Sequence, residues 1–287
     1  MTHSVTQFLA RMRSRAIAPF EVVVYAVFGL WVLAMISVPI QRWMMGDGAL
    51  PAAITLGVAF QALAVVIILV FGLGWARALA ISGLVISLGW LVEAVGHTTG
   101  FPFGDYHYTD ILQPQLGGVP LLIPLAWMMM MPPSWAVAHS ITRRMTGRKR
   151  LVAFVGVTML AFTAWDLFLD PQMVGWGLWV WDDPSGFTYF GIPWSNYLGW
   201  LLSVGLITIA ALPLLKLDRL PLSPLLQVYA LTLALEAIGL LVFWGMPGPA
   251  LVGTAGMGAM LIWGVWALRR DHRLAQTLTP EASSQGV

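Results

Sequence analysis

Four carboxylic acids in this sequence lie inside or at the end of long apolar segments, where an acid is costly and usually has a function. Glu93 lies in WLVEAVGH, Asp166 and Asp170 lie in TAWDLFLDPQM, and Glu236 lies in LTLALEAIGL. Because burial in an apolar medium favours the neutral form of a carboxylic acid, such groups can carry a proton near neutral pH. The pattern predicts proton chemistry or an ion path.

Three of these acids are expected at one depth. Counted at ~1.5 Å per residue from the expected inner helix ends, Glu93, Asp166 and Glu236 fall ~21 to 23 Å from the inner boundary of a ~30 Å hydrocarbon core. We therefore expect them in one layer in the outer third of the membrane, as in a shared polar pocket.

Each acid also has a structural interpretation. Glu93 and His97 are four residues apart on one helical face, so they could simply hydrogen-bond each other. Asp170 precedes Pro171 at an expected helix end and could be a turn residue. Glu236 has no ionisable neighbour within a turn, so it needs a partner on another helix or must stay protonated.

Aromatic residues accompany the acids. Trp127 and Trp165 are expected near the acid layer, too deep for an interfacial belt. Tyr106 and His107 could line the pocket from above or anchor a turn in FPFGDYHYTD. A belt at the membrane surface is the default interpretation for most of the tryptophans that flank the second outer loop: Trp176, Trp179, Trp181, Trp194 and Trp200.

Several chemistries are excluded or disfavoured. The chain has no cysteine, and of its five histidines only His97 and His107 fall near the acids, too few for a di-iron hydroxylase. No GxGxxG, phosphate-binding glycine loop or GxSxG motif occurs. We expect no metal and no cofactor, with a site of Glu93, His97, Asp166 and Asp170 as the weaker alternative. Acids facing an apolar substrate among aromatic rings suit acid catalysis on an alkene.

The elements that must position these residues are transmembrane helices. The 287 residues are 59% hydrophobic and 10% charged, with a mean hydropathy of +0.80, which indicates an integral membrane protein. We predict an all-α, polytopic helical bundle of about eight transmembrane helices, since eight apolar stretches approach the ~20 residues that cross a bilayer: 20–41, 52–71, 76–96, 119–140, 151–170, 194–215, 222–244 and 249–268.

Charge sets the expected orientation. If the connections alternate between two sides, every lysine and arginine except Arg42 falls on one side, so both termini are predicted to be cytoplasmic. The loops 97–118 and 171–193 then face outward. We expect one transmembrane domain, 1–270, and a disordered cytoplasmic tail, 271–287. The net charge of +2 gives no reason to expect nucleic acid as a partner; the expected surroundings are the lipid bilayer of the cell membrane.

Two long segments resemble the carotenoid hydratase family. They are EAVGHTTGFPFGDYHYTDIL with GVPLLIPLAW, and AWDLFLDPQMVGWGLWVW with YFGIPWSNYLGW. One position departs from the family pattern, since Gln113 stands where the family has glycine. The resemblance implies addition of water to the terminal double bond of an acyclic carotenoid, giving a tertiary alcohol without a redox cofactor. It leaves open association with other carotenoid-pathway enzymes.

The residues suggest a mechanism for that reaction. We expect Asp166 to be the general acid, because it lies beside Trp165, whose ring face can stabilise a cation. Glu93, oriented by His97, would position or deprotonate the water, although these two acids could exchange roles. Glu236 and Asp170 would complete the polar network. Trp127 would contribute to positioning, and Asn196, Tyr106 and His107 could hold water from the outer loops.

Two alternatives stay open. A carotenoid cyclase or another prenyl-transforming enzyme could protonate the same alkene and let an internal double bond capture the cation. A proton-coupled transporter could also place several acids at one depth, but it needs a polar route to both faces. No polar stripe leads inward past Val85 or Val157.

Overall fold

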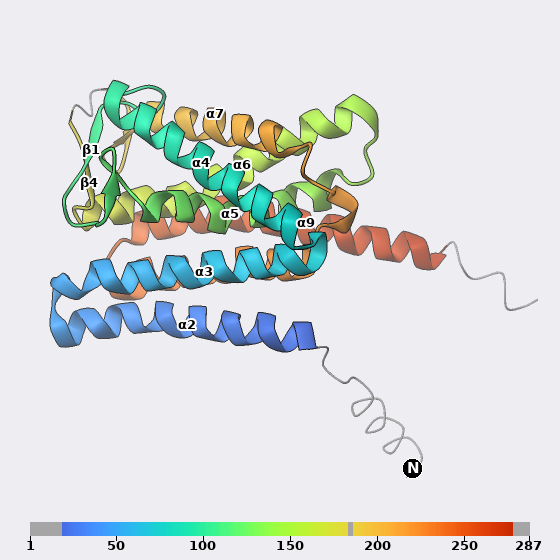
Figure 1. Ribbon diagram of the computed structural model, residues 1–287, viewed down its shortest axis with the longest axis horizontal. Coiled ribbons are helices and arrows are strands. Elements are labelled where there is room, and N and C mark those ends of the chain that lie inside the picture. The colour runs from blue at the N-terminus through green and yellow to red at the C-terminus, as the bar shows by residue number, and fades with distance from the viewer. Residues whose placement is uncertain (1–18, 183–185, 278–287) are drawn as a thin grey trace, which may run out of the picture.

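The computed structural model describes residues 19–182 and 186–277, and eight long helices dominate it (Figure 1). Each predicted apolar stretch corresponds to one helix, with ends that differ by up to nine residues. The helices are α2 (Pro19–Met45), α3 (Leu50–Leu73), α4 (Trp75–Thr99), α5 (Leu122–Thr142), α6 (Gly147–Gly175), α7 (Trp194–Ala211), α8 (Leu222–Ile238) and α9 (Pro247–Thr277). Short helical segments η1 (Asp47–Ala49), η2 (Leu217–Arg219) and η3 (Gly239–Phe243), the last a π-helix, connect or extend them.

Seven of these helices are long and apolar enough to cross a membrane, which confirms a polytopic all-α bundle. The exception is α5, which contains Pro132 and Pro133. Eighteen of its 21 residues are buried, and it packs against α3, α4, α6, α8 and α9. A helix that is buried on every side lies at the centre of a bundle, so α5 is the core around which the other helices are arranged.

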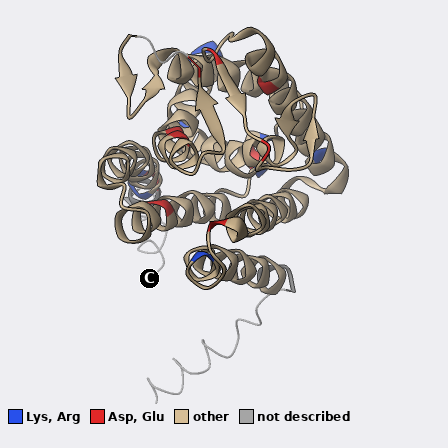
Figure 2. Ribbon diagram, turned by 90° about the vertical axis from the view of Figure 1, so that its left-hand side faces the viewer, with Lys and Arg blue, Asp and Glu red and all other residues tan. Residues whose placement is uncertain are grey.

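Both described ends of the chain lie at the same end of the bundle, opposite the strands β1 and β4 (Figure 1). At that end Asp271 is buried and ion-paired with Arg143 and Arg144. Helix α9 continues to Thr277, so the boundary predicted at residue 271 falls inside a helix, and residues 278–287 of the predicted tail lie outside the described residues. Viewed end-on from the strands, most of the ribbon carries no charged residue (Figure 2).

The two outer loops are joined into one cap. Strand β1 (Tyr106–Tyr108) of the first loop pairs antiparallel with β4 (Trp179–Trp181) of the second, with Tyr106 opposite Trp181. Two hairpins complete the cap, β2 (Gln115–Leu116) with β3 (Val119–Pro120) and β5 (Thr188–Tyr189) with β6 (Ile192–Pro193). Residues about 70 positions apart in sequence are thereby fixed beside each other over the helix ends.

The sequence predicts that helix α6 ends at Asp170. In the structure α6 continues through Pro171 to Gly175. Proline lacks an N–H group, so it leaves the carbonyl of Leu167, four residues earlier, without its helical donor. The Tyr189 hydroxyl donates to that carbonyl at 3.1 Å. The cap therefore supplies the hydrogen bond that the Leu167 carbonyl lacks, and the helix continues past the proline. As a result, Asp170 lies inside the bundle.

The cap is anchored to the helices by Phe103. Its ring packs between α4 and α7 at two glycines: a Cβ on Gly96 would lie 2.5 Å from Phe103 Cδ2, and one on Gly199 would lie 2.7 Å from Cδ1. The hydroxyl of Ser195 donates to the Phe103 carbonyl at 2.8 Å. Only glycine allows this close approach, which sets the height of β1 above the helices.

We expect Gly96→Ala to lower stability, because overpacking at a buried contact costs ~1–3 kcal/mol. Gly83→Ala on the same helix is the matched control, since a Cβ there meets no atom within 4 Å. The apparent Tm in detergent should fall by several degrees for Gly96→Ala and stay level or rise for Gly83→Ala. Equal Tm values would show that the Phe103 contact tolerates an added methyl group.

Candidate active site

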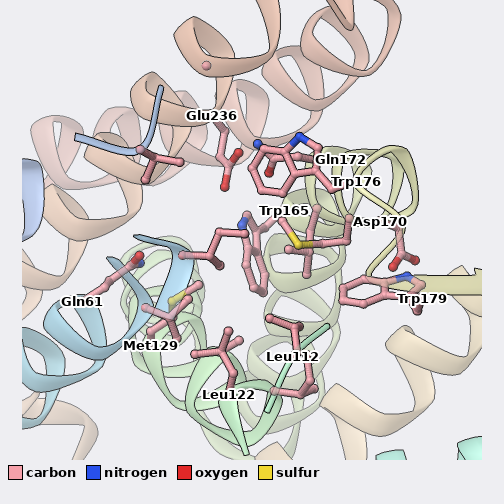
Figure 3. Close-up of a pocket in the computed structure, with 18 of the residues that line it drawn as sticks. Gln61, Leu112, Leu122, Met129, Trp165, Asp170, Gln172, Trp176, Trp179 and Glu236 are labelled. Carbon is pink, nitrogen blue, oxygen red and sulfur yellow. The ribbon is translucent and has the colours of Figure 1, made fainter. Parts of the chain in front are cut away.

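A cavity of about 400 Å³ lies below the cap, between the helices. Glu93, Asp170 and Glu236 contribute to its wall, while aromatic and aliphatic side chains form most of the remainder. Tyr106, Trp179 and Trp181 close it from the cap. Figure 3 shows Asp170 and Gln61 on opposite sides of the lining, with Trp165 between them. An apolar cavity with a few convergent polar groups is the usual form of a small-molecule site.

Glu93 accepts three hydrogen bonds from neutral donors. Its Oε2 atom accepts from the hydroxyls of Tyr106 at 2.7 Å and Tyr108 at 2.8 Å, and its Oε1 atom accepts from the Trp127 indole at 2.9 Å. A carboxylate has about four acceptor positions, so these donors leave about one for a molecule in the cavity. Three donors to one buried carboxyl group offset part of the cost of its burial.

The hydroxyl groups of Tyr106 and Tyr108 stay protonated at neutral pH and can therefore donate hydrogen bonds. Burial, and then the neighbouring Glu93 carboxylate, raise the pKa of Tyr106 and of Tyr108 well above the usual range. Both residues alternate with His107 along β1, which turns their side chains to the same face of the strand. The strand thus delivers two hydroxyl groups to one carboxylate.

Asp166 and Asp170 share one amide. The Asn196 Nδ2 group donates to Asp166 Oδ2 at 3.1 Å and also to Asp170 Oδ2. The Trp200 indole N–H, which can only donate, bonds to Asn196 Oδ1 at 3.0 Å. This bond fixes the amide so that its NH₂ group must face the two aspartates.

The two aspartates differ in their access to the cavity. Asp170 contributes to the wall, beside the ring nitrogen of Trp179 (Figure 3). Asp166 is fully buried, does not line the cavity, and has an Oδ1 atom with no hydrogen-bond partner among the described residues. The residue expected to donate the proton therefore lies behind the one that faces a ligand.

Aromatic rings form one wall of the cavity. Trp127 and Trp200 stack almost parallel, with centroids 4.8 Å apart and an interplanar angle of 4°. Phe162 stacks on both of them, and Trp165 stands perpendicular to Trp200 at 6.3 Å. The faces and edges of electron-rich rings beside an acid can stabilise a cation.

Glu236 belongs to a separate part of the cavity. It is buried, and the indole ring of Trp165 lies beside it. Figure 3 shows Gln172 close to it on the same side. Glu93, Asp166 and Asp170 thus form one cluster, while Glu236 lines the cavity beside Trp165.

Two predicted roles for histidine are wrong. His97 does not orient Glu93, whose partners come from the cap and α5; the Nδ1 atom of His97 is buried without a partner among the described residues. His107 faces away from the cavity and pairs with the half-exposed Asp182 at 2.7 Å. Across residues 19–182 and 186–277, no group of three or more histidine, aspartate or glutamate side chains is arranged to hold a metal ion.

Several wall residues were not recognised in the sequence. Trp179, Trp181 and Trp200 were assigned to an interfacial belt, yet they are buried and line the cavity, whereas Trp194 is 45% exposed as a belt residue should be. A signal for Trp200 was present, because it follows Asn196 by four residues on one helical face. Tyr108 follows Tyr106 by two, the spacing of one strand face.

Comparisons with known proteins identify the family of this chain. Residues 52–262 match a family described as "Carotenoid biosynthesis protein". A bisanhydrobacterioruberin hydratase from Haloarcula japonica is 34% identical over 115 residues, which cover 39% of this chain and 37% of that protein. No solved structure matches the chain. Because the family match spans most of the chain, including the cap and the acids that line the cavity, the protein belongs to the carotenoid biosynthesis protein family.

Proposed function

We propose that this protein is a carotenoid hydratase of the 1',2' type, which adds water to the terminal double bond of an acyclic carotenoid. The observation that supports it best is an apolar, aromatic cavity with Asp170 and Glu93 in its wall, each held by its own hydrogen-bond network. The hydratase name of the similar archaeal protein favours the same reaction. The substrates are the carotenoid and water, and the chemistry needs no redox cofactor.

Asp170 is the proton donor in this proposal. Two buried carboxylates that share one amide repel each other, so the Asp166 and Asp170 pair retains one proton, as in other acid pairs. Asp170 presents that proton to the less substituted alkene carbon, because it is the member of the pair that lines the cavity. Asp166 keeps the pair protonated and Asn196 keeps it in place. The roles of donor and partner are thus exchanged relative to the sequence-based expectation.

The resulting tertiary cation is stabilised by two features. The rings of Trp165, Trp200 and Trp127 offer π electrons, and the Glu93 carboxylate supplies a fixed negative charge. The free acceptor position of Glu93 orients a water molecule. That water forms the new C–O bond, and its surplus proton returns to the Asp170 carboxylate, which restores the pair.

The cyclase alternative uses the same proton donor but captures the cation with an internal double bond. Its product has the mass of the substrate, whereas hydration adds the mass of water. Transport receives less support, because apolar side chains such as Val85, Trp135 and Phe154 are fully buried on the inner side of the acids. We place the enzyme in the cell membrane, where other carotenoid-pathway enzymes would supply its substrate.

We expect Asp170→Asn to lower the yield of the water adduct by ~10²-fold or more, the usual contribution of a general acid. The assay is pigment extraction and mass analysis from a host that makes an acyclic carotenoid. Asp182→Asn, which changes an exposed acid outside the cavity, should keep full activity. Undiminished product from Asp170→Asn, with loss only in Asp166→Asn, would return the donor role to Asp166.

We expect Tyr106→Phe to lower turnover by ~10-fold or more, since a hydrogen bond to a charged group contributes ~1.5–3 kcal/mol. Tyr229→Phe is the matched control: that hydroxyl is also buried, but it donates to the Ala161 carbonyl and lies outside the cavity wall. Both variants should lose some thermal stability, and only Tyr106→Phe should lose activity per folded molecule. Equal activities would show that the bond to Glu93 is only structural.

A further inference from the structure

The cavity has a second arm that leads away from the acids. Helix α2 contributes Met35, Ile36 and Pro39 to the lining, and the end of α8 with η3 contributes Ile238 and Phe243. Gln61 of α3, which lies on the opposite side of the lining from Asp170 in Figure 3, belongs to this arm. The cavity therefore extends from the acid cluster to the flank formed by α2 and α8.

This arm reaches the outer surface of the bundle. Ile36 is 50% exposed and Ile238 is 54% exposed, although both line the cavity. Both residues lie within helices long and apolar enough to span the membrane, so the surface around them contacts hydrocarbon. A residue that faces both the cavity and the lipid marks an opening between the two.

Contacts between α2 and the end of α8 bound this opening on its outer side. Helix α2 packs chiefly on α3, and it approaches η3 near its outer end, where the Trp43 and Phe243 rings lie 5.5 Å apart and the Arg42 guanidinium lies 5.2 Å from the Trp244 ring. The chain of α8 widens into a π-helix at Gly239–Phe243, a form that often occurs at functional sites. The contacts close the gap at the outer end and leave it lined by aliphatic side chains below.

The size of the substrate requires such an opening. The proposed function implies a long, rigid polyene dissolved in the bilayer, with an extended length on the order of the ~30 Å hydrocarbon core. A cavity of about 400 Å³ can hold an end group but not the whole chain. The cap blocks the outer end, where the Tyr106 and Trp181 rings lie 5.1 Å apart.

We propose that the gap between α2 and the α8–η3 segment, lined by Ile36, Pro39, Ile238 and Phe243, is a lateral portal that binds the polyene while its end group reaches Asp170. The portal rests on the proposed function and specifies how the substrate is held. It predicts that the enzyme selects a long apolar chain beyond the end group, and that one end of the carotenoid is treated at a time.

The test compares Ile36→Trp and Ile238→Trp with Leu33→Trp and Leu241→Trp. The control positions lie on the same two segments and are 64% and 49% exposed, but neither lines the cavity. Each protein, reconstituted in vesicles, is given an acyclic carotenoid or a short prenyl alcohol with the same end group. The portal variants should hydrate the carotenoid about tenfold more slowly, the effect of overpacking a passage, and should hydrate the short alkene at the wild-type rate.

Equal turnover of the carotenoid by Ile36→Trp and Leu33→Trp would overturn the portal, as would an equal loss on both substrates. Pigment that copurifies with each variant from a carotenoid-producing host gives a readout independent of catalysis. The two portal variants should retain less pigment than their controls. If wild-type protein forms no water adduct from either substrate, the hydratase proposal fails, while the pigment comparison still decides whether the portal binds a polyene.

Discussion

A carboxyl group buried inside an apolar bundle needs hydrogen-bond donors, and this requirement determines how the outer loops pack on the helices of this protein. A buried charge is tolerated only when it is paired or fully hydrogen-bonded. Within residues 19–182 and 186–277 no ion pair involves Glu93, and its three donors come from β1 and α5. The first outer loop must therefore fold down onto the helices. The strand pairing with the second loop and the packing of Phe103 between Gly96 and Gly199 hold it there.

The same logic extends to the second outer loop. Its strand β4 covers the cavity with Trp179 and Trp181, and its hairpin supplies the Tyr189 hydroxyl to the carbonyl that Pro171 leaves free. This bond lets α6 continue past Asp170. The aspartate pair thus depends on a loop residue about 20 positions away, just as Glu93 depends on Tyr106. The positions of the buried acids in this fold are set by the cap as much as by the helices.

The spans, the buried acids and the family could be predicted, because hydropathy, the cost of a buried charge and two long motifs can be read from short segments of the sequence. The partners of the acids could not. Helical spacing identifies neighbours within one helix, so it paired Glu93 with His97, whereas the true partners lie 13, 15 and 34 residues away. Proline usually ends a helix, so Asp170 was placed at an end. Tryptophans near an interface usually form a belt, so Trp179, Trp181 and Trp200 were not predicted to lie in the cavity wall.

The two acid networks differ in a way that suits their proposed roles. Glu93 accepts from three donors, which offset part of the cost of its burial and leave it about one free acceptor position. Asp166 and Asp170 meet each other and a single amide, which favours retention of a proton. In the proposed mechanism the aspartate pair donates the proton, and Glu93 stabilises the cation and orients the water. The Trp127 indole donates to Glu93, and the Trp200 indole donates to Asn196. Because these two rings stack on each other, they fix the positions of the two hydrogen-bond networks relative to each other.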